Sequence, residues 1–174
     1  MDMEAVVQPL TTNLLELVAG WDGPRVVSGY WPIRGEIDSR PIMAGLIAAG
    51  HQITLPVVVA RERPMIFRRW TPDTEMIKGD LPVYEPEPDA PELLPDTLLI
   101  PMLAFDQHGF RLGMGGGFYD RTVPELRKLG PVTLIGLAHH AQQGEDLPRE
   151  PHDVPLDWIV TDQGAMSFAS KADG

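Results

Sequence analysis

A glycine-rich segment occupies residues 111–121, where the chain reads RLGMGGGFYDR. Its loop consists of four glycines and one methionine: Gly113, Met114, Gly115, Gly116 and Gly117. Glycines leave room for a ligand and permit positive φ angles, so that successive backbone N–H groups can face one concavity. A run that favours a helix, 118–129, follows at once, and unpaired N–H groups at a helix N-terminus attract anions. The segment therefore predicts a phosphate-binding loop.

Charged residues surround this loop. Arg111 and Arg121 bracket it, and their guanidinium groups suit phosphate oxygens. Asp120 lies in the first turn of the expected helix, where a carboxylate is favoured and can share a magnesium ion with phosphates. The alternative interpretation is an ordinary glycine-rich turn with solvated charges at its ends. Two arginines and an acid on one rim favour the phosphate site.

Strand-like and helix-like segments alternate around the loop. We expect helices at 12–19, at 39–50 after an N-cap at Asp38 or Ser39, and at 118–129, and strands at 25–33, 53–59, 65–70, 97–101, 133–138 and 158–161. Pro56 indicates that the middle of the 53–59 strand lies at an edge or a bend. The proline-rich stretch 80–95 indicates a surface loop or an extended excursion.

This alternation favours an α/β fold, a three-layer αβα sandwich around a mostly parallel, Rossmann-like sheet. Ligands of such sheets collect at the carboxyl ends of the strands, and the glycine loop follows the 97–101 strand. The chain length fits a single domain over residues 1–174.

The composition narrows the classes of function. A formal net charge of −11 argues against non-specific nucleic-acid binding. The absence of cysteine excludes disulfides, thiol catalysis and thiolate metal sites. No apolar run is long enough to span a membrane, and the first residues are acidic and resemble no secretory signal. We therefore expect a cytoplasmic protein. We also expect a monomer or a weak homo-oligomer.

Two adjacent histidines, His139 and His140, lie close to Glu145 and Asp146 and form a weak candidate for a metal site. Adjacent residues on a strand face opposite sides, so we expect no metal ligation there.

The glycine segment and its surroundings resemble the 5-formyltetrahydrofolate cyclo-ligase family, also called methenyltetrahydrofolate synthetases. The resemblance runs from about residue 25 to residue 161 and rests on residues 103–106, 109, 111–113 and 115–121 together with Tyr30, Pro32, Glu36, Leu55-Pro56, Met65, Glu85-Pro86, Leu147-Pro148, His152-Asp153, Leu156-Asp157 and Ile159-Val160-Thr161. An ordered series of landmarks is far more specific than the loop alone.

The resemblance implies a NagB/RpiA/CoA-transferase-like fold and a ring closure that depends on ATP and magnesium. The formyl oxygen of 5-formyltetrahydrofolate takes the γ-phosphate of ATP and becomes a leaving group. N10 then attacks the activated carbon, phosphate departs and 5,10-methenyltetrahydrofolate forms. The task of the protein is mostly positioning and neutralisation of charge.

The resemblance also implies a role for individual residues. Residues 113–117 and Phe118 cradle the ATP phosphates, with Arg111 and Arg121 adding positive charge. Asp120 and Asp153 hold magnesium. Glu36, Met65 and Tyr119 line the folate pocket. The catalytic residues are Arg111, Tyr119 and Arg121.

The chain differs from the family at several positions, and the largest difference lies at its N-terminus. The family begins with a basic helix whose cations reach the ATP phosphates, and this chain has no lysine or arginine before Arg25. We expect Arg34, Arg61 or Arg63 to replace those cations in an active enzyme. The alternatives are a non-catalytic homologue that binds a nucleotide or a folate, and related chemistry on another N-formyl compound.

Overall fold

A seven-stranded sheet forms the centre of the computed structural model, which describes residues 1–79, 83–113 and 116–168. From edge to edge the strands are β11 (Gly164–Ser167), β10 (Trp158–Thr161), β9 (Thr133–Leu137), β6 (Thr97–Pro101), β1 (Val26–Ser28), β2 (Gln52–Val57) and β3 (Ile66–Trp70). The strands from β10 to β2 pair in parallel, and β11 and β3 add antiparallel edges. The predicted α/β fold with a mostly parallel sheet is confirmed.

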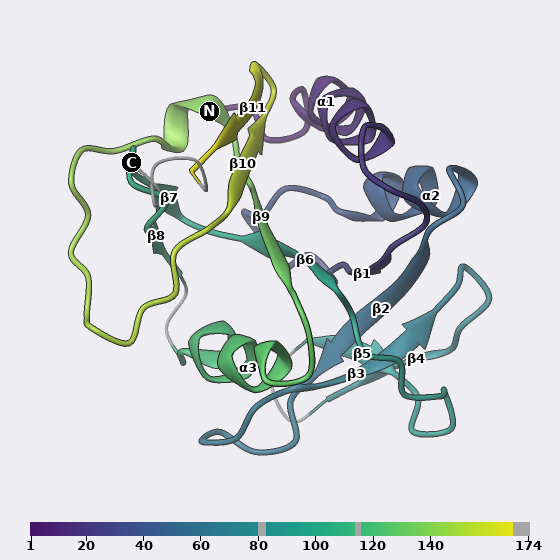
Figure 1. The fold of residues 1–174 in the computed structure, drawn as a ribbon. Coiled ribbons are helices and arrows are strands. Elements are labelled where there is room, and N and C mark those ends of the chain that lie inside the picture. Colours follow the sequence, from purple (N-terminus) through teal and green to yellow (C-terminus); the bar gives the residue numbers. More distant parts are fainter. Residues whose placement is uncertain (80–82, 114–115, 169–174) are drawn as a thin grey trace.

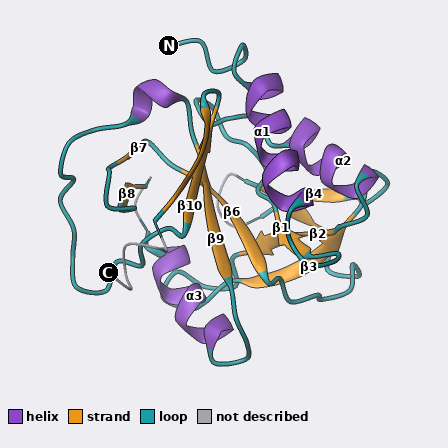
Figure 2. Cartoon of the chain, turned by 45° about the horizontal axis from the view of Figure 1, so that its top comes forward, coloured by secondary structure: helices purple, strands orange, loops and turns teal. Residues whose placement is uncertain are grey.

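Helices cover both faces of this sheet (Figures 1 and 2). Helices α1 (Val7–Ala19) and α2 (Arg40–Ala48) lie on one face, and α3 (Phe118–Arg127) lies on the other. Strand β6 illustrates the arrangement, because Leu99 belongs to the core under α1 and α2 whereas Leu98 belongs to the core under α3. Consecutive strand residues face opposite sides, so an apolar strand with helices above and below is buried on both faces.

Three helices lie close to where the sequence predicts them. Helix α2 begins after Ser39 with Pro41 in its first turn, as expected. Helix α1 begins at Val7 rather than at residue 12, because Leu10 joins Leu14 in a buried stripe with the four-residue spacing of a helix. No residue of α1 is basic.

The expectation that Pro56 lies at an edge holds only on the β1 side of the strand. Strand β2 lies between β1 and β3, and Pro56 pairs with Phe67 inside the β2–β3 ladder. The pairing of β2 with β1 reaches only Thr54. Pro56 therefore lies beyond the parallel ladder, where its missing N–H group costs no hydrogen bond to β1.

Two small hairpins stand outside the main sheet. Strands β4 (Met76–Lys78) and β5 (Tyr84–Pro86) form one. The surface loop or extended excursion predicted over 80–95 thus contains the strand β5, and its residues 80–82 lie outside the described part. Strands β7 (Ala104–Phe105) and β8 (Arg111–Leu112) form the other and lead directly into the glycine loop. Both hairpins are too short to produce an alternating pattern in the sequence.

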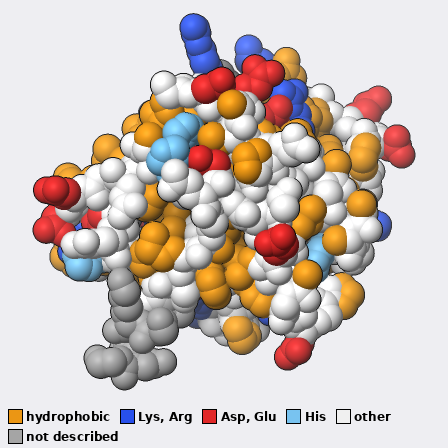
Figure 3. All heavy atoms as spheres, turned by 90° about the horizontal axis from the view of Figure 1, so that it is seen from above, with side chains coloured by type: hydrophobic (Ala, Val, Ile, Leu, Met, Phe, Trp, Pro, Cys, Tyr) orange, Lys and Arg blue, Asp and Glu red, His pale blue; other side chains and the backbone are white. Residues whose placement is uncertain are grey.

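Acidic side chains are spread over the face of the molecule seen in Figure 3, and most of the few basic ones gather at its upper rim. On this face, positive charge is therefore confined to one region. Within the described residues, the helices are too short or too polar to cross a membrane.

Candidate functional site

The described part of the glycine loop has the backbone conformation that the sequence predicts. Gly116 and Gly117 both have positive φ angles, of 90° and 64°. Gly117 is the N-cap of α3, and no side chain caps this end of the helix. The N–H groups of the first turn of α3 therefore remain available to an anion. Gly113 is exposed at the end of β8, and Met114 and Gly115 lie outside the described residues.

Arg111 lies at the start of the loop, and both of its terminal nitrogens are hydrogen-bonded. Its side chain is only 9% exposed, and its Nη2 donates to Oδ1 of Asp120 over 3.2 Å. Its Nη1 donates to the carbonyl of Val154 over 2.8 Å, and the N–H of Val154 donates to the same Asp120 oxygen over 3.0 Å. This triangle joins β8, α3 and the segment before β10. Among the described residues, Oδ2 of Asp120 accepts no hydrogen bond.

Arg121 lies on the other side of the loop and is more open. Its guanidinium carbon is 4.9 Å from the centre of the Phe118 ring. A Cβ atom built on Gly117 would be 3.2 Å from its Nη1, so the guanidinium group lies directly beside the loop. Its Nη2 donates to the carbonyl of Arg61, and its Nε is buried with no partner in the described structure. A buried N–H group without an acceptor is the feature that a phosphate oxygen would satisfy.

Asp153 lies close to Asp120 in space. The N–H of Val154, the next residue, bonds to Asp120, which brings this backbone to the first turn of α3. Oδ2 of Asp153 accepts the N–H of Glu150 over 2.8 Å, and its side chain is 26% exposed. The backbone beside Asp153 thus lies against the first turn of α3.

Glu36 and Tyr119 interact with Tyr30 on the side of β1. The N–H of Ile33 donates to Oε1 of Glu36 over 2.8 Å, and the Tyr30 hydroxyl donates to the carbonyl of Ile37. Burial raises the pKa of Glu36, an effect that the bond from Ile33 only partly opposes. Burial, followed by the Glu36 carboxylate, raises the pKa of Tyr119 and that of Tyr30. An acid and two neutral phenols therefore share a partly dry environment.

Met65 packs beside the first turn of α3. It is 8% exposed, and its N–H donates to Oγ1 of Thr122 over 2.9 Å. This hydrogen bond joins the start of β3 to the helix that follows the glycine loop. Sequence reasoning did not single out Thr122, and no sequence pattern signals that contact.

Asp106 is a second residue whose role the sequence did not reveal. It is fully buried, and its carboxylate accepts N–H groups from His108, Phe110 and Leu147. These bonds fix the turn between β7 and β8 and so the strand that carries Arg111. An Asp followed three residues later by Gly109, at a φ of 87°, is the available sequence signal of such a turn.

His139 and His140 do not face opposite sides, contrary to expectation. Their rings lie 4.6 Å apart at η1 (His140–Gln142), and Asp162 completes a group whose ligand atoms lie within 4.8 Å of one another. Nδ1 of His139 accepts the N–H of Ala141, so the proton of the neutral ring resides on Nε2 and leaves no lone pair there for a metal. His140 is paired with Asp162 at 2.7 Å. The hydrogen bonds, rather than the strand geometry, argue against metal ligation.

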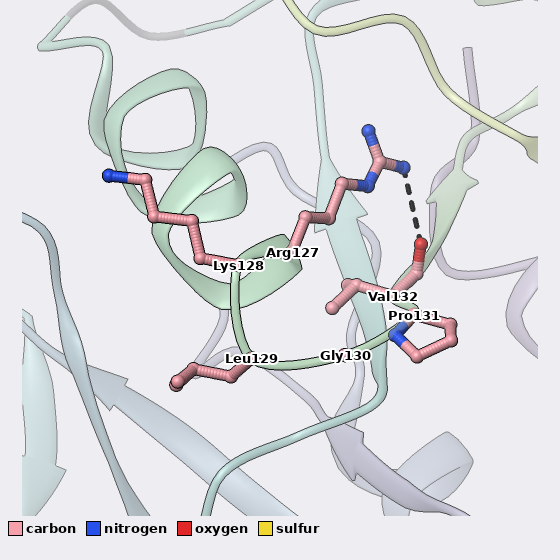
Figure 4. A pocket seen from close by; sticks show the side chains of 6 residues that line it. All are labelled: Arg127, Lys128, Leu129, Gly130, Pro131 and Val132. Carbon is pink, nitrogen blue, oxygen red and sulfur yellow. Dashed lines mark hydrogen bonds between the residues drawn. The ribbon is translucent and has the colours of Figure 1, made fainter.

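An open depression lies at the opposite end of α3 from the glycine loop (Figure 4). It is lined by one short segment, residues 127–132. Arg127 is held there by the carbonyl of Val132 and by Asp157, and Lys128 pairs with Glu125. Its cations are thus already paired, and the depression contains none of the predicted site residues.

Comparisons with known proteins identify the family. Residues 6–162 match the 5-formyltetrahydrofolate cyclo-ligase family. The chain belongs to this family. A 5-formyltetrahydrofolate cyclo-ligase of Escherichia coli K12 is 40% identical over 142 residues, which cover 78% of this chain and 76% of that protein. One from Haemophilus influenzae is 35% identical over 154 residues, covering 86% of this chain and 81% of that protein.

Solved structures of family members have the same fold. The 5,10-methenyltetrahydrofolate synthetase of Aquifex aeolicus superposes with a TM-score of 0.71 at 26% identity, covering 93% of this chain and 82% of that one. The synthetase of Mycoplasma pneumoniae gives a TM-score of 0.70 at 23% identity, covering 91% of this chain and 85% of that one. The resemblance found in the sequence is confirmed, and the family match includes the whole of α1.

Proposed function

We propose that this chain catalyses the ATP- and magnesium-dependent cyclisation of 5-formyltetrahydrofolate to 5,10-methenyltetrahydrofolate, with release of ADP and phosphate. One observation carries the proposal beyond the family match. Gly116 and Gly117 adopt left-handed conformations at the uncapped N-terminus of α3, between Arg111 and Arg121. This arrangement suits the phosphates of a nucleotide.

The residues around the loop fit a triphosphate. The first-turn N–H groups of α3 and the buried Nε of Arg121 lack protein acceptors in the described structure, and phosphate oxygens are strong acceptors. ATP supplies the phosphoryl group that makes the formyl oxygen a leaving group. Arg121 and the loop backbone would bind the phosphates and neutralise the negative charge that grows on them during the transfer.

Asp120 and Asp153 would hold the magnesium ion. Oδ2 of Asp120 and Oδ1 of Asp153 accept no hydrogen bond within the described residues, although Oδ1 of Asp153 lies 3.7 Å from His152. Magnesium accepts one or two protein carboxylates together with phosphate oxygens and water. We expect Asp153→Asn to raise the magnesium concentration needed for half-maximal turnover by about tenfold. An unchanged requirement would assign the ion to other ligands.

Glu36, Tyr119 and Met65 would form the folate side of the site. A desolvated carboxylate is a strong acceptor for the N–H donors of a pterin ring, and binding of those donors offsets the cost of its burial. The ring of Tyr119, which is partly buried against the core under α3, would also pack against a flat ligand, and its raised pKa keeps the hydroxyl neutral at physiological pH. We assign this enzyme to the cytoplasm.

The decisive experiment measures formation of 5,10-methenyltetrahydrofolate from 5-formyltetrahydrofolate, ATP and magnesium. We expect turnover that stops when magnesium is chelated. Separate titrations with ATP and with the folate, by calorimetry, identify the alternatives. Binding of both ligands, or of the folate alone, without turnover would support the non-catalytic homologue, which the lack of basic residues in α1 favours. Binding of ATP with no affinity for the folate would point to another N-formyl substrate.

A further inference from the structure

The turn at residues 60–63 is tied to the first turn of α3. The N–H of Arg63 closes the turn on the carbonyl of Ala60. The carbonyl of Arg61 accepts the guanidinium group of Arg121, and Met65 at the end of the segment bonds to Thr122. This segment, which joins β2 to β3, therefore lies against the helix end that follows the glycine loop.

The site has little free positive charge besides Arg121. Arg111 is matched by Asp120, the described residues of the loop carry no charge, and α1 has no cation. The side chains of Arg61 and Arg63 are exposed and form no ion pair in the part of the chain that the structure describes. Glu62 between them leaves the turn with a net positive charge.

We infer that Arg61 and Arg63 form the outer wall of the nucleotide site and attract the triphosphate. The inference rests on the proposed function. The bond between Arg121 and the Arg61 carbonyl sets the wall beside Gly117, which the same guanidinium group touches. Exposed cations next to a polyanion act through a screened field, so their contribution falls as salt rises. They strengthen nucleotide binding and leave folate binding unchanged.

The test compares two double variants that remove the same charge. Arg61→Ala with Arg63→Ala alters the wall. Arg25→Ala with Arg69→Ala is the control, because Arg25 precedes β1 and Arg69 pairs with the middle of β2, away from the loop. For each protein, calorimetry gives the Kd of a non-hydrolysable ATP analogue at low and at high salt. Steady-state kinetics give the KM values for ATP and for 5-formyltetrahydrofolate.

The wall variant should bind the analogue about tenfold more weakly at low salt, with a smaller difference at high salt. Its folate KM, its thermal unfolding and the affinity of the control should stay unchanged, and Arg61→Lys with Arg63→Lys should restore most of the affinity. Equal losses in both double variants, or a rise in the folate KM alone, would overturn the inference. Wild-type protein that binds the analogue without turnover would contradict the proposed function and leave the wall testable by binding.

Discussion

Arg111 and Arg121 flank the same glycine loop in two different environments. Arg111 is nearly enclosed, and two of its nitrogens bond to Asp120 and to the carbonyl of Val154. Arg121 rests on the Phe118 ring and keeps a buried Nε with no acceptor in the described structure. The fold supplies hydrogen-bond acceptors for Arg111. It supplies none for Nε of Arg121 within the described residues.

This difference predicts that Arg111 positions other residues of the site and that Arg121 binds the ligand. A buried ion pair whose groups are all hydrogen-bonded holds elements together, and its charge is largely cancelled for a ligand. A buried N–H group without an acceptor lowers stability until a ligand provides one. We therefore expect Arg111 to act through the position of Asp120 and Arg121 to act on the phosphates directly. Both depend on the loop between them.

Gly116→Val should have the largest effect, because it disrupts the loop that both arginines serve. Gly116 has a φ of 90°, and a Cβ atom there would be 2.9 Å from the Phe118 ring. Valine strongly disfavours this conformation. We expect ATP binding to fall by more than about a hundredfold while the sheet stays folded, because a local strain of roughly 1–3 kcal/mol is smaller than the stability of a typical domain.

Calorimetric titration with ATP and circular dichroism measure the two parts of this prediction. Gly130→Ala is the matched control, because no atom lies within 4 Å of a Cβ built there. A folded Gly116→Val protein with unchanged ATP affinity would remove the loop from the site.

Arg111→Ala should lower stability more than any other single change at the site. It leaves the carbonyl of Val154 and one bond of Asp120 without a donor. Breaking such a pair costs about 3–5 kcal/mol when it is fully buried, and we expect about 2–3 kcal/mol here because Asp120 is 16% exposed. Urea denaturation measures the loss. A change below roughly 0.5 kcal/mol would show that the triangle does not support the fold.

Arg121→Ala should show the reverse pattern. Its carbonyl contact with Arg61 is exposed, so we expect the free energy of unfolding to change by less than about 1 kcal/mol. The KM for ATP should rise by about tenfold to a hundredfold, since a cation at a transferring phosphate contributes several kcal/mol at most. Steady-state kinetics test this. Equal stability losses in Arg111→Ala and Arg121→Ala would erase the distinction between the two arginines.

The sequence predicted the elements that carry this comparison better than it predicted their contacts. Strong local signals, such as the glycines before a helix or the apolar run of β6, correctly located the loop and the sheet. The short hairpins β4–β5 and β7–β8 have too few residues to produce a periodic pattern, so they were missed.

Contacts between segments that are distant in the chain were harder to predict from the sequence than helices and strands. The tether between Arg121 and the 60–63 turn joins segments about sixty residues apart through a backbone carbonyl, which any residue type provides. The three N–H bonds to Asp106 likewise depend on a turn that forms only in the fold. The histidine pair was misplaced for a different reason. The alternation of side chains along a strand does not apply to His139 and His140, because both lie beyond the end of β9.

Glu36→Gln should have the smallest effect on stability and sharpens the comparison on the folate side. Burial raises the pKa of Glu36 above its ordinary value of 4.5, so the folded state binds this proton more tightly than the unfolded state. Stability should therefore fall as pH rises from the ordinary pKa to the raised one. Glutamine keeps the acceptor for Ile33 and cannot titrate, so it should flatten that part of the stability profile. Urea denaturation between about pH 4 and about pH 8 measures the slope, with the exposed Glu16→Gln as the control.

The KM for 5-formyltetrahydrofolate should rise in Glu36→Gln while the KM for ATP stays constant. An equal rise in both KM values would place Glu36 outside a separate folate pocket.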